Sequence, residues 1–441
     1  MILNRFIVVF TSFLMLCVIL ICYLHLEISG TANISIATVA SLFPLFCTLL
    51  LAKNKSVLSP IGFFIISISV FILSRPIINI FTEMDIVEAG VVKGKYEIAK
   101  TVYLVGIGIA TSCLFMSFPV RYEKYDFFIF KPVLTLPSWI RSCMLYLSII
   151  LILLFWYKSY VVAQLVGTES YFSILESSGV HDHLKFFFLS KMILVFYLLS
   201  SSERPCHLYF WCSFLLFIGS LGFMAIGLRG YTISYFMMFL FFLNERKKIN
   251  MVFMIPIGIM VVYVSALVLE HRLGFSVFKN SFEMIYLPLG QQGASFEVVY
   301  GAANFLDEIK SCISYSEYFS GSDFGACVDL ARGVGFTSGG FASSYFAEGL
   351  YFGLVVYILL CAVIGIIIKY LDHVSAIRMQ ASVVAVIDRS RCGLLLFCIL
   401  PNLVYFARSS SFDLIYKFIV SCIFIAVYAF FFERQGCKND C

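Results

Sequence analysis

The stretch FMAIGLRGYTISYF, residues 223–236, places an arginine between two apolar runs. Gly227 and Gly230 lie on either side of Arg229, and closely spaced glycines favour a turn over a continuous helix. Apolar runs on both sides of a turn are typical of helices that cross a membrane and return. The arginine is then either an anchor at the membrane surface or a functional group held below it. The remainder of the chain favours the functional group.

The composition sets the class of protein. Hydrophobic residues make up 61% of the 441 positions, and charged residues make up only 13%. Soluble globular proteins are much less apolar. We therefore expect an all-α, polytopic integral membrane protein, with residues 1–441 forming a single transmembrane domain. Residues 6–24 are long and apolar enough to span the bilayer and lack a signal-peptide cleavage site, which predicts an uncleaved signal anchor.

Apolar runs along the chain predict about 12 transmembrane helices, because about 20 residues cross the hydrocarbon core. An even number places both termini on one side of the membrane. The predicted spans are residues 6–24, 34–51, 59–80, 101–119, 140–159, 186–200, 208–227, 230–243, 250–269, 350–370, 392–407 and 412–432.

Positive charge decides the orientation. The connections after even-numbered spans carry basic clusters such as KNK at residues 53–55 and NERKK at residues 244–248. The positive-inside rule assigns these connections, and with them both termini, to the cytoplasm. The long segment at residues 270–349, between spans 9 and 10, is then periplasmic. The net charge of +5 is small, and we expect no nucleic-acid partner.

Three arginines lie at short or interrupted spans. The run after Arg229 has about 13 residues and covers about 20 Å of a core about 30 Å thick. Arg408 likewise follows a short span that contains Pro401, and Arg75 precedes Pro76 in the third span. Arginines at such depth mark cavities that hold polar substrates, although each can instead extend to the lipid headgroups. Their planar forks suit phosphate and pyrophosphate oxygens.

The outer segment contains two further patterns. Of the 15 cysteines, 13 fall in predicted spans or on the cytoplasmic side, whereas Cys312 and Cys327 fall in residues 270–349, where a disulfide is chemically possible. Apolar positions between Phe296 and Leu306 follow helical spacing. This predicts a short amphipathic helix that lies on the membrane surface or packs against the protein itself.

Two stretches resemble the bacterial O-antigen polymerases, the Wzy family, including the enterobacterial-common-antigen type. SGGFASSYFAEGLYFGLVVYILLCAVIGIIIKYLD, residues 338–372, is similar to that family's serine-rich loop, Ala-Glu pair and late span. PNLVYFARSSSFDLIYKFIV, residues 401–420, is similar to its last hairpin, and the GLRG turn is a weaker match. The paired Arg-and-Gly and His-and-Arg spacings of some family members are not legible here.

The resemblance implies a glycosyltransferase of the bacterial inner membrane. A growing glycan on undecaprenyl pyrophosphate would be transferred at the periplasmic face onto another lipid-linked repeat unit, with release of undecaprenyl pyrophosphate. The family implies no nucleotide sugar, no metal and no cofactor, but a co-polymerase partner that sets chain length. An O-antigen ligase and a lipid-linked oligosaccharide flippase are the alternatives.

The negative charge that develops on the leaving pyrophosphate in such a transfer suggests roles for particular residues. Arg229 and Arg408 would stabilise the leaving pyrophosphate, with Arg75 or Arg332 assisting. Glu348 is the first candidate for the general base that activates the acceptor hydroxyl, although an acid near a helix start is also favoured by the helix dipole.

Weaker candidates complete the predicted site. Asp413 and Glu270 are fallback bases, and His271 beside Arg272 could orient a sugar or phosphate, unless they mark only the end of an interfacial loop. The HDH stretch at residues 181–183 is too small a set for a metal site. Lys191, within a predicted span, is either a functional cation or a sign that this span begins later.

Overall fold

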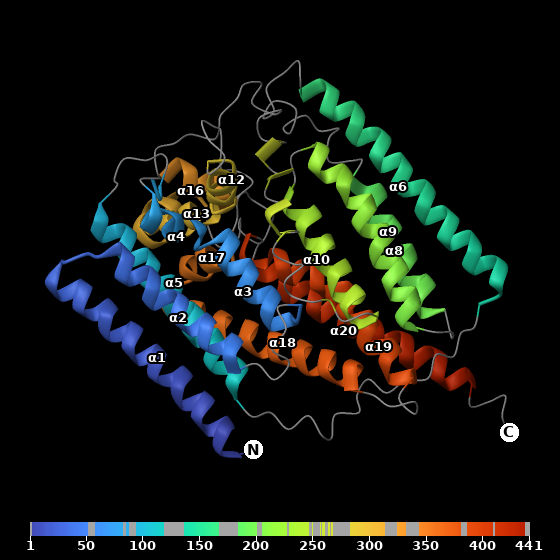
Figure 1. Cartoon of the computed structure of the whole chain (residues 1–441), viewed down its shortest axis with the longest axis horizontal. Coiled ribbons are helices and arrows are strands. Elements are labelled where there is room, and N and C mark those ends of the chain that lie inside the picture. Colours follow the sequence, from blue (N-terminus) through green and yellow to red (C-terminus); the bar gives the residue numbers. More distant parts are fainter. Residues whose placement is uncertain are drawn as a thin grey trace. The chain divides into compact units, whose positions relative to one another are not determined.

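A computed structural model gives the structure of the chain, and every regular element that it describes is helical (Figure 1). The structure describes residues 2–51, 58–82, 85–87, 94–118, 136–166, 184–200, 205–226, 229–246, 249, scattered positions between 256 and 267, 283–313, 324–331, 344–380, 386–408 and 411–436. The expected all-α class is therefore confirmed for this part of the chain.

The chain forms two compact units. The first contains Met1–Arg121, Leu289–Asp372 and Tyr405–Ile415. The second contains Tyr122–Pro288, His373–Val404 and Tyr416–Cys441. Part of the predicted outer segment thus belongs to the same unit as the first helices of the chain.

Helix α5, Lys95–Ser117, is the buried centre of the first unit. It packs against α1, Ile2–Ser29, and α2, Ile34–Leu51 (Figure 1). In its apolar stretch 89% of the residues are buried, against 17% in α1. A small residue allows this close packing: a Cβ at Gly106 of α5 would lie 2.4 Å from the Ser41 hydroxyl of α2.

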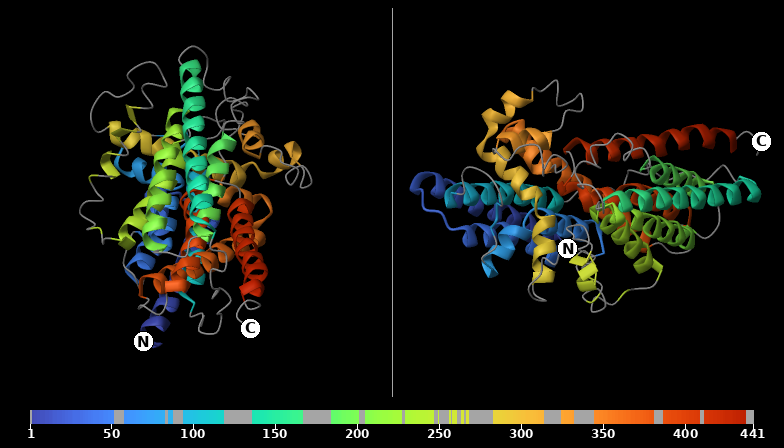
Figure 2. Two further views of the ribbon diagram at one scale, coloured as in Figure 1. Left: turned by 90° about the vertical axis from the view of Figure 1, so that its right-hand side faces the viewer. Right: turned by 90° about the horizontal axis from the view of Figure 1, so that it is seen from above.

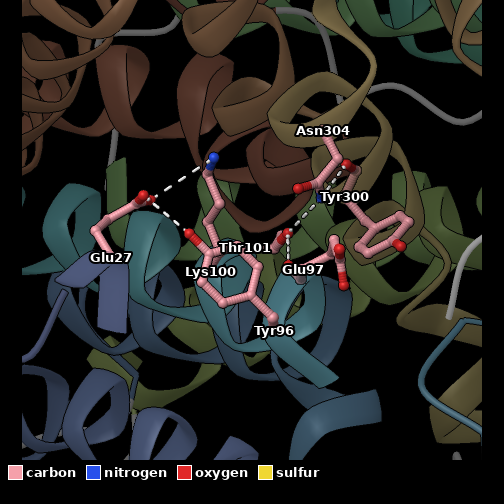
Figure 3. A network of polar contacts seen from close by, with 7 residues as sticks. All are labelled: Glu27, Tyr96, Glu97, Lys100, Thr101, Tyr300 and Asn304. Carbon is pink, nitrogen blue, oxygen red and sulfur yellow. Dashed lines mark hydrogen bonds and ion pairs between the residues drawn. The ribbon is translucent and has the colours of Figure 1, made fainter. Parts of the chain in front are cut away.

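Helix ends that are predicted to share the outer face come together in this unit (Figure 3). Glu27, near the end of α1, accepts a 2.9 Å hydrogen bond from Tyr96 and lies 3.7 Å from the Lys100 amine at the start of α5. Asn304 of the outer segment donates to the Thr101 hydroxyl at 3.2 Å. The contacts are therefore consistent with the predicted order of crossings.

The opposite ends of these helices also meet. The hydroxyls of Ser12 in α1 and Ser117 at the end of α5 are 3.0 Å apart. Lys369 of α18, Leu354–Gln380, donates to the Met116 carbonyl at 2.6 Å. Residues in the predicted cytoplasmic halves of three spans thus lie together in the first unit.

The third predicted span, residues 59–80, is not one continuous helix. It consists of α3, Pro60–Phe71, and α4, Ser74–Phe81, which are bent by 61°. Proline has no N–H, and its ring clashes with the carbonyl four residues earlier. For Pro76 that carbonyl belongs to Ile72, and the helix breaks there. The third predicted span is therefore broken near the proline that the sequence marks as a disturbance.

The helix predicted between Phe296 and Leu306 exists as α13, Ser295–Asn304, and is packed against its own protein. Phe296, Val299 and Tyr300 are almost completely buried. The neighbouring elements are α5, α14 (Leu306–Cys312), α16 (Phe324–Ala331) and α17 (Tyr345–Tyr351). Of the two sequence alternatives, the structure supports packing over a surface helix.

The second unit contains a bundle of four helices (Figures 1 and 2). These are α6 (Ser138–Val166), α8 (Leu184–Leu199), α9 (Pro205–Ala225) and α10 (Arg229–Arg246). Their centre is aromatic: the rings of Phe155, Phe187 and Phe223 lie 4.8–5.4 Å apart, with Tyr235 at 5.0 Å from Phe187. The unit also includes most of α19, Val386–Tyr405, most of α20, Ser411–Gly436, and most of α12, Glu283–Gln292.

Lys191 lies inside α8, which begins at Leu184 and therefore ahead of the lysine. Its amine donates to the Cys398 carbonyl at 3.4 Å and lies 5.6 Å from the centre of the Tyr235 ring. The helix does not start after Lys191. The cation is held by protein groups within the second unit.

Helices overlap each predicted span outside residues 250–269, of which only scattered positions are described. Within the described residues, five helices are long and apolar enough to cross a membrane, or six if α3 and α4 are one span. The chain is thus a polytopic membrane protein. The number of 12 spans and the position of both termini stay predictions.

Candidate active site

Arg75 is buried in the first turn of α4 and bound on several sides. Its Nε donates to the Gly290 carbonyl at 2.8 Å and its Nη1 to the Ile86 carbonyl at 3.3 Å. Nη1 also forms an ion pair with Glu297 of α13. The Arg75 side chain is only 3% exposed. It does not extend to the lipid headgroups. Around its buried guanidinium, carboxylate and carbonyl oxygens take the place of water.

A glycine allows α4 and the start of α13 to approach. A Cβ at Gly293 would lie 2.3 Å from the Ser74 hydroxyl and 2.9 Å from Cγ of Arg75. Real Cβ atoms do not come so close to their neighbours, so the absence of a side chain is a condition for this contact. The Gly293 position therefore helps to bring Glu297 within reach of Arg75.

Arg408 ends a 3₁₀ turn, Phe406–Arg408, that follows α19. Phe406 stacks on Phe64 with ring centres 5.5 Å apart, and the Ala407 N–H donates to the Ser67 hydroxyl at 3.3 Å. These contacts attach the turn to α3. The Arg408 Nη1 donates to the Gln292 side chain at 3.1 Å, while its Nε is buried without a hydrogen-bond partner among the described residues.

One short segment, residues 290–292, accepts hydrogen bonds from both arginines. Arg75 donates to the Gly290 carbonyl, and Arg408 donates to the Gln292 side chain two residues later. Gln292 is 6% exposed. Arg75 is neutralised by Glu297, whereas the contact of Arg408 with an uncharged amide leaves its positive charge uncompensated by that partner. Of the two, Arg408 is the better suited to attract an anion.

Glu348 lies in α17, a seven-residue helix, and is 2% exposed. Its backbone N–H donates to the Ser344 carbonyl at 3.1 Å. One turn earlier, Tyr345 meets Phe406 edge-on with ring centres 5.6 Å apart. The helix of Glu348 therefore packs directly on the turn that carries Arg408.

Several buried polar atoms of this region have no hydrogen-bond partner in the part of the chain that the structure describes. They are the Nε of Arg408 and the hydroxyls of Ser74, Ser295 and Ser344. The three serines precede Arg75, begin the helix of Glu297 and precede the helix of Glu348, respectively. Native proteins rarely leave such groups unsatisfied, and buried polar groups of this kind commonly bind ordered water or an ion.

The remaining predicted site residues are placed less fully. Arg229 is the first residue of α10 in the second unit, and its side chain lies outside the described part of the structure. Asp413 is in the first turn of α20, and its side chain is likewise not described. Glu270, His271, Arg272, Arg332 and the HDH stretch at residues 181–183 all lie outside the described residues.

Two residues of this site are absent from the sequence prediction, Glu297 and Gln292. Both stand in the apolar sequence IYLPLGQQGASFEVVYG, residues 285–301. Polar groups isolated in such a run, next to glycines, are a usable signal, because burying them is costly without partners. The helical spacing of the neighbouring apolar residues is the more visible pattern, and it indicates only the apolar face of the helix.

Comparisons with known proteins give the family. A family model described as O-antigen polysaccharide polymerase Wzy matches residues 5–322. The chain belongs to the Wzy family. This Wzy chain is also 34% identical over 417 residues to an O-antigen polymerase of Escherichia coli, covering 90% of this chain and 89% of the relative. No solved structure matches it.

The matched region divides the site of this Wzy protein. Arg75, Gln292 and Glu297 lie within residues 5–322, whereas Glu348 and Arg408 lie beyond them. The two stretches that carry the sequence resemblance are also beyond residue 322, so the family model and the motifs support the same family from different parts of the chain. Within the described residues of this Wzy protein, no group of three or more His, Cys, Asp or Glu is arranged to hold a metal.

Proposed function

We propose that this Wzy polymerase extends O-antigen at the periplasmic face of the bacterial inner membrane, with undecaprenyl-pyrophosphate-linked repeat units as its substrate. The bond between the donor's anomeric carbon and the pyrophosphate oxygen breaks. A bond forms between that carbon and a hydroxyl oxygen of the acceptor repeat unit. Undecaprenyl pyrophosphate leaves with the electron pair, and the proton of the hydroxyl passes to a base. Family membership favours this reaction over ligation or flipping.

The disulfide between Cys312 and Cys327 supports the periplasmic side. Disulfides form and persist in oxidising compartments such as the bacterial periplasm. Both cysteines fall in the segment that the charge pattern assigns to that face. The reaction is then separated from cytoplasmic nucleotide sugars, and the lipid-linked donor itself supplies the activated bond.

Arg408 is the proposed contact for the leaving pyrophosphate. Its buried Nε, without a partner among the described residues, is the observation that carries this assignment. A guanidinium donates in a planar fork that matches phosphate oxygens, and its charge stabilises the charge that develops as the bond breaks. Arg75 has a different role, because its Nε and Nη1 already bind Gly290, Ile86 and Glu297. It builds the site.

Further cations contribute in this proposal. Arg229, the first residue of α10, is a second proposed contact for a phosphate oxygen. Arg272, Arg332 and His271, which lie outside the described residues, are proposed to contact phosphate or sugar groups of the substrate. Cations held below the membrane surface can receive a lipid diphosphate from within the bilayer.

Glu348 is the proposed base that accepts the proton of the acceptor hydroxyl. Its burial and the packing of α17 on the turn of Arg408 support this role. A base and a leaving-group contact must lie on the two sides of one anomeric carbon, so adjacent elements are a requirement of the reaction. Asp413, in the first turn of α20, is the alternative base. A co-polymerase that regulates chain length is the proposed protein partner.

The lipopolysaccharide ladder of a deletion strain tests the assignments. Complementation with Arg408→Ala should leave core plus one repeat unit, and Arg408→Lys should restore little, because lysine is a point charge without the fork. Glu348→Gln should give the same short product. Arg229→Ala and Arg229→Lys test whether the Arg229 side chain is needed for polymerisation.

Matched controls separate chemistry from folding. Arg141, at the start of α6 on the predicted cytoplasmic side, also has a buried Nε without a partner among the described residues. Arg141→Lys should give a normal ladder, because the lipid diphosphate is bound at the other face. Every variant is compared at equal membrane level. A normal ladder from both Arg408 variants would refute the pyrophosphate contact. Complete loss of attached glycan on deletion would indicate ligation or flipping instead of polymerisation.

A further inference from the structure

The disulfide joins two helices of the outer segment. Cys312 ends α14 and Cys327 lies in α16, 15 positions later, with Cα atoms 5.7 Å apart. The sequence leaves this pairing open, and the structure contains it. Both helices pack against α13, so the crosslink fixes one wall of the region that holds Glu297.

Residues close to the two cysteines contact the same tyrosine, Tyr351. The carbonyl of Ile313, next to Cys312, accepts a 2.8 Å hydrogen bond from the Tyr351 hydroxyl. The ring of Phe324, three residues before Cys327, meets the Tyr351 ring edge-on at 5.4 Å. Tyr351 is completely buried. Its hydroxyl therefore contacts the residue that follows α14, and its ring contacts α16.

Tyr351 is also the last residue of α17, the helix of Glu348. Glu348 lies three residues from Tyr351 and three residues from Tyr345, and side chains at this spacing are neighbours on a helix surface. Tyr345 holds the other end of the helix: its hydroxyl donates to the Leu360 carbonyl at 2.5 Å, and its ring contacts Phe406. Burial raises the pKa of Tyr345 well above its ordinary value, so the hydroxyl keeps the proton that it donates.

We propose that the Cys312–Cys327 disulfide and Tyr351 act as a bracket that positions Glu348 relative to Arg408, so that the polymerase reaches its full rate only in the oxidised form. These three are positioning residues, and their role rests on the proposed function of Glu348 and Arg408. Oxidation removes two protons and two electrons from the thiols. A protein disulfide of the oxidising compartment accepts the electrons by thiol–disulfide exchange.

The physical reason is the short length of α17. A seven-residue helix is too short to be stable by itself, so its position depends on its attachments. Reduction removes the covalent link between α14 and α16, which leaves only their packing to hold the Ile313 carbonyl and the Phe324 ring against Tyr351. Misplacement of a reacting group by about 1 Å can lower a rate by about 100-fold. A loosened bracket should therefore lower kcat while substrate binding, which involves other groups, is nearly unchanged.

The test uses the purified full-length protein in lipid nanodiscs with a synthetic repeat unit on a polyprenyl diphosphate. Polymer formation is measured with and without dithiothreitol, and thiol labelling reports the state of Cys312 and Cys327. Reduction should lower kcat by about tenfold or more, leave KM within about twofold and reverse on reoxidation. The double variant Cys312→Ala/Cys327→Ala should have the low kcat of the reduced protein, and dithiothreitol should not change it.

Tyr351→Phe gives an independent test that leaves the crosslink intact. It keeps the ring contact with Phe324 but removes the hydrogen bond to Ile313, so kcat should fall while labelling shows the disulfide still formed. Reduction in the folded protein avoids any failure to fold during synthesis, and thermal unfolding is recorded for each sample.

Two results would overturn the bracket. One is unchanged kcat in wild-type protein whose two cysteines are fully labelled as thiols. The other is a rise in KM with constant kcat, which would assign the disulfide to substrate binding. Glu348→Gln in the oxidised protein separates this failure from a failure of the proposed function. Full activity of that variant would refute the role of Glu348 as the base. An inactive Glu348→Gln variant together with a wild-type protein that is insensitive to reduction would refute only the bracket.

Discussion

Arg75 and Glu297 are 222 positions apart in the sequence and form a buried ion pair. The pair connects α4, which begins after the bend at Ile72, to α13 of the outer segment. This part of the outer segment therefore belongs to the packed interior of the first unit. Its position there brings Gln292 to Arg408 and completes the candidate site.

Removal of one charge of this pair should be costly. Glu297→Gln leaves the buried Arg75 without its carboxylate, and the free energy of unfolding should fall by about 3 kcal/mol. Thermal unfolding of the detergent-purified protein measures the change. The Cys312–Cys327 disulfide should remain formed, because a covalent crosslink does not depend on the ion pair.

The matched control removes both charges. Arg75→Met combined with Glu297→Leu replaces the pair by apolar groups of similar size, which is often close to neutral in a buried environment. The double variant should be more stable than Glu297→Gln alone. Equal losses in the two variants would show that the pair is not held together as a unit.

Gln292 offers a test of what Arg408 does. Gln292→Leu removes the acceptor of Nη1, and the polymerisation rate should fall by about tenfold because the guanidinium is less well oriented. Gln292→Glu restores an acceptor but neutralises Arg408. If Arg408 binds pyrophosphate, the glutamate variant should be the slower of the two.

A purely structural role for this contact predicts the opposite order. The carboxylate that Gln292→Glu introduces would pair with Arg408 and hold the turn at least as well as the native amide, so the glutamate variant would be the faster one. Rates of polymer formation at equal protein concentration, with lipid-linked repeat unit in excess, distinguish the two orders.

Gly293→Ala should separate α4 from α13. The new Cβ would lie 2.3 Å from the Ser74 hydroxyl and 3.1 Å from the Gly290 carbonyl, and overpacking of this kind costs about 1–3 kcal/mol. Ser74→Ala in the same background removes the nearest atom and should recover part of the loss in thermal unfolding. No recovery would place the strain at the backbone contact.

Gly353 joins α17 to α18 with a φ of 99°. An alanine there has open space around its Cβ, so any cost of Gly353→Ala comes from the backbone conformation alone. We expect a loss of about 1–3 kcal/mol, measured by chemical or thermal unfolding. Gly258→Ala, whose Cβ likewise has open space, is the control, and an equal response of the two variants would contradict the conformational cause.

The helices of this protein are predictable because lipid imposes a simple condition. A segment in hydrocarbon must satisfy all its backbone hydrogen bonds internally, so long apolar runs become helices wherever they occur. The apolar pattern does not predict the break in the third span, although Pro76 signals a disturbance. Where a proline interrupts a helix is set by its clash with a carbonyl four residues earlier, and neighbouring packing decides whether the result is a kink or two helices.

The site is predictable in part. Arg75 and Arg408 stand out in the sequence because charges in apolar surroundings are rare and costly, and the structure places both against residues 290–292. The same reasoning assigns both arginines to the leaving pyrophosphate, with Arg75 in an assisting role. Their difference depends on partners: a carboxylate neutralises one, and an amide binds the other.

Composition and local pattern are enough to predict the class of protein, the approximate helices and the arginines of interest, since each depends on residues that are neighbours along the chain. The pairing of Glu297 with Arg75, the contact of Gln292 with Arg408, and the connection that Tyr351 makes between the disulfide and the helix of Glu348 become visible only in the folded chain. These contacts join residues 38 to 222 positions apart. No periodicity encodes such pairs, because they form only when the packing of several helices brings polar groups into a space where water no longer competes for them.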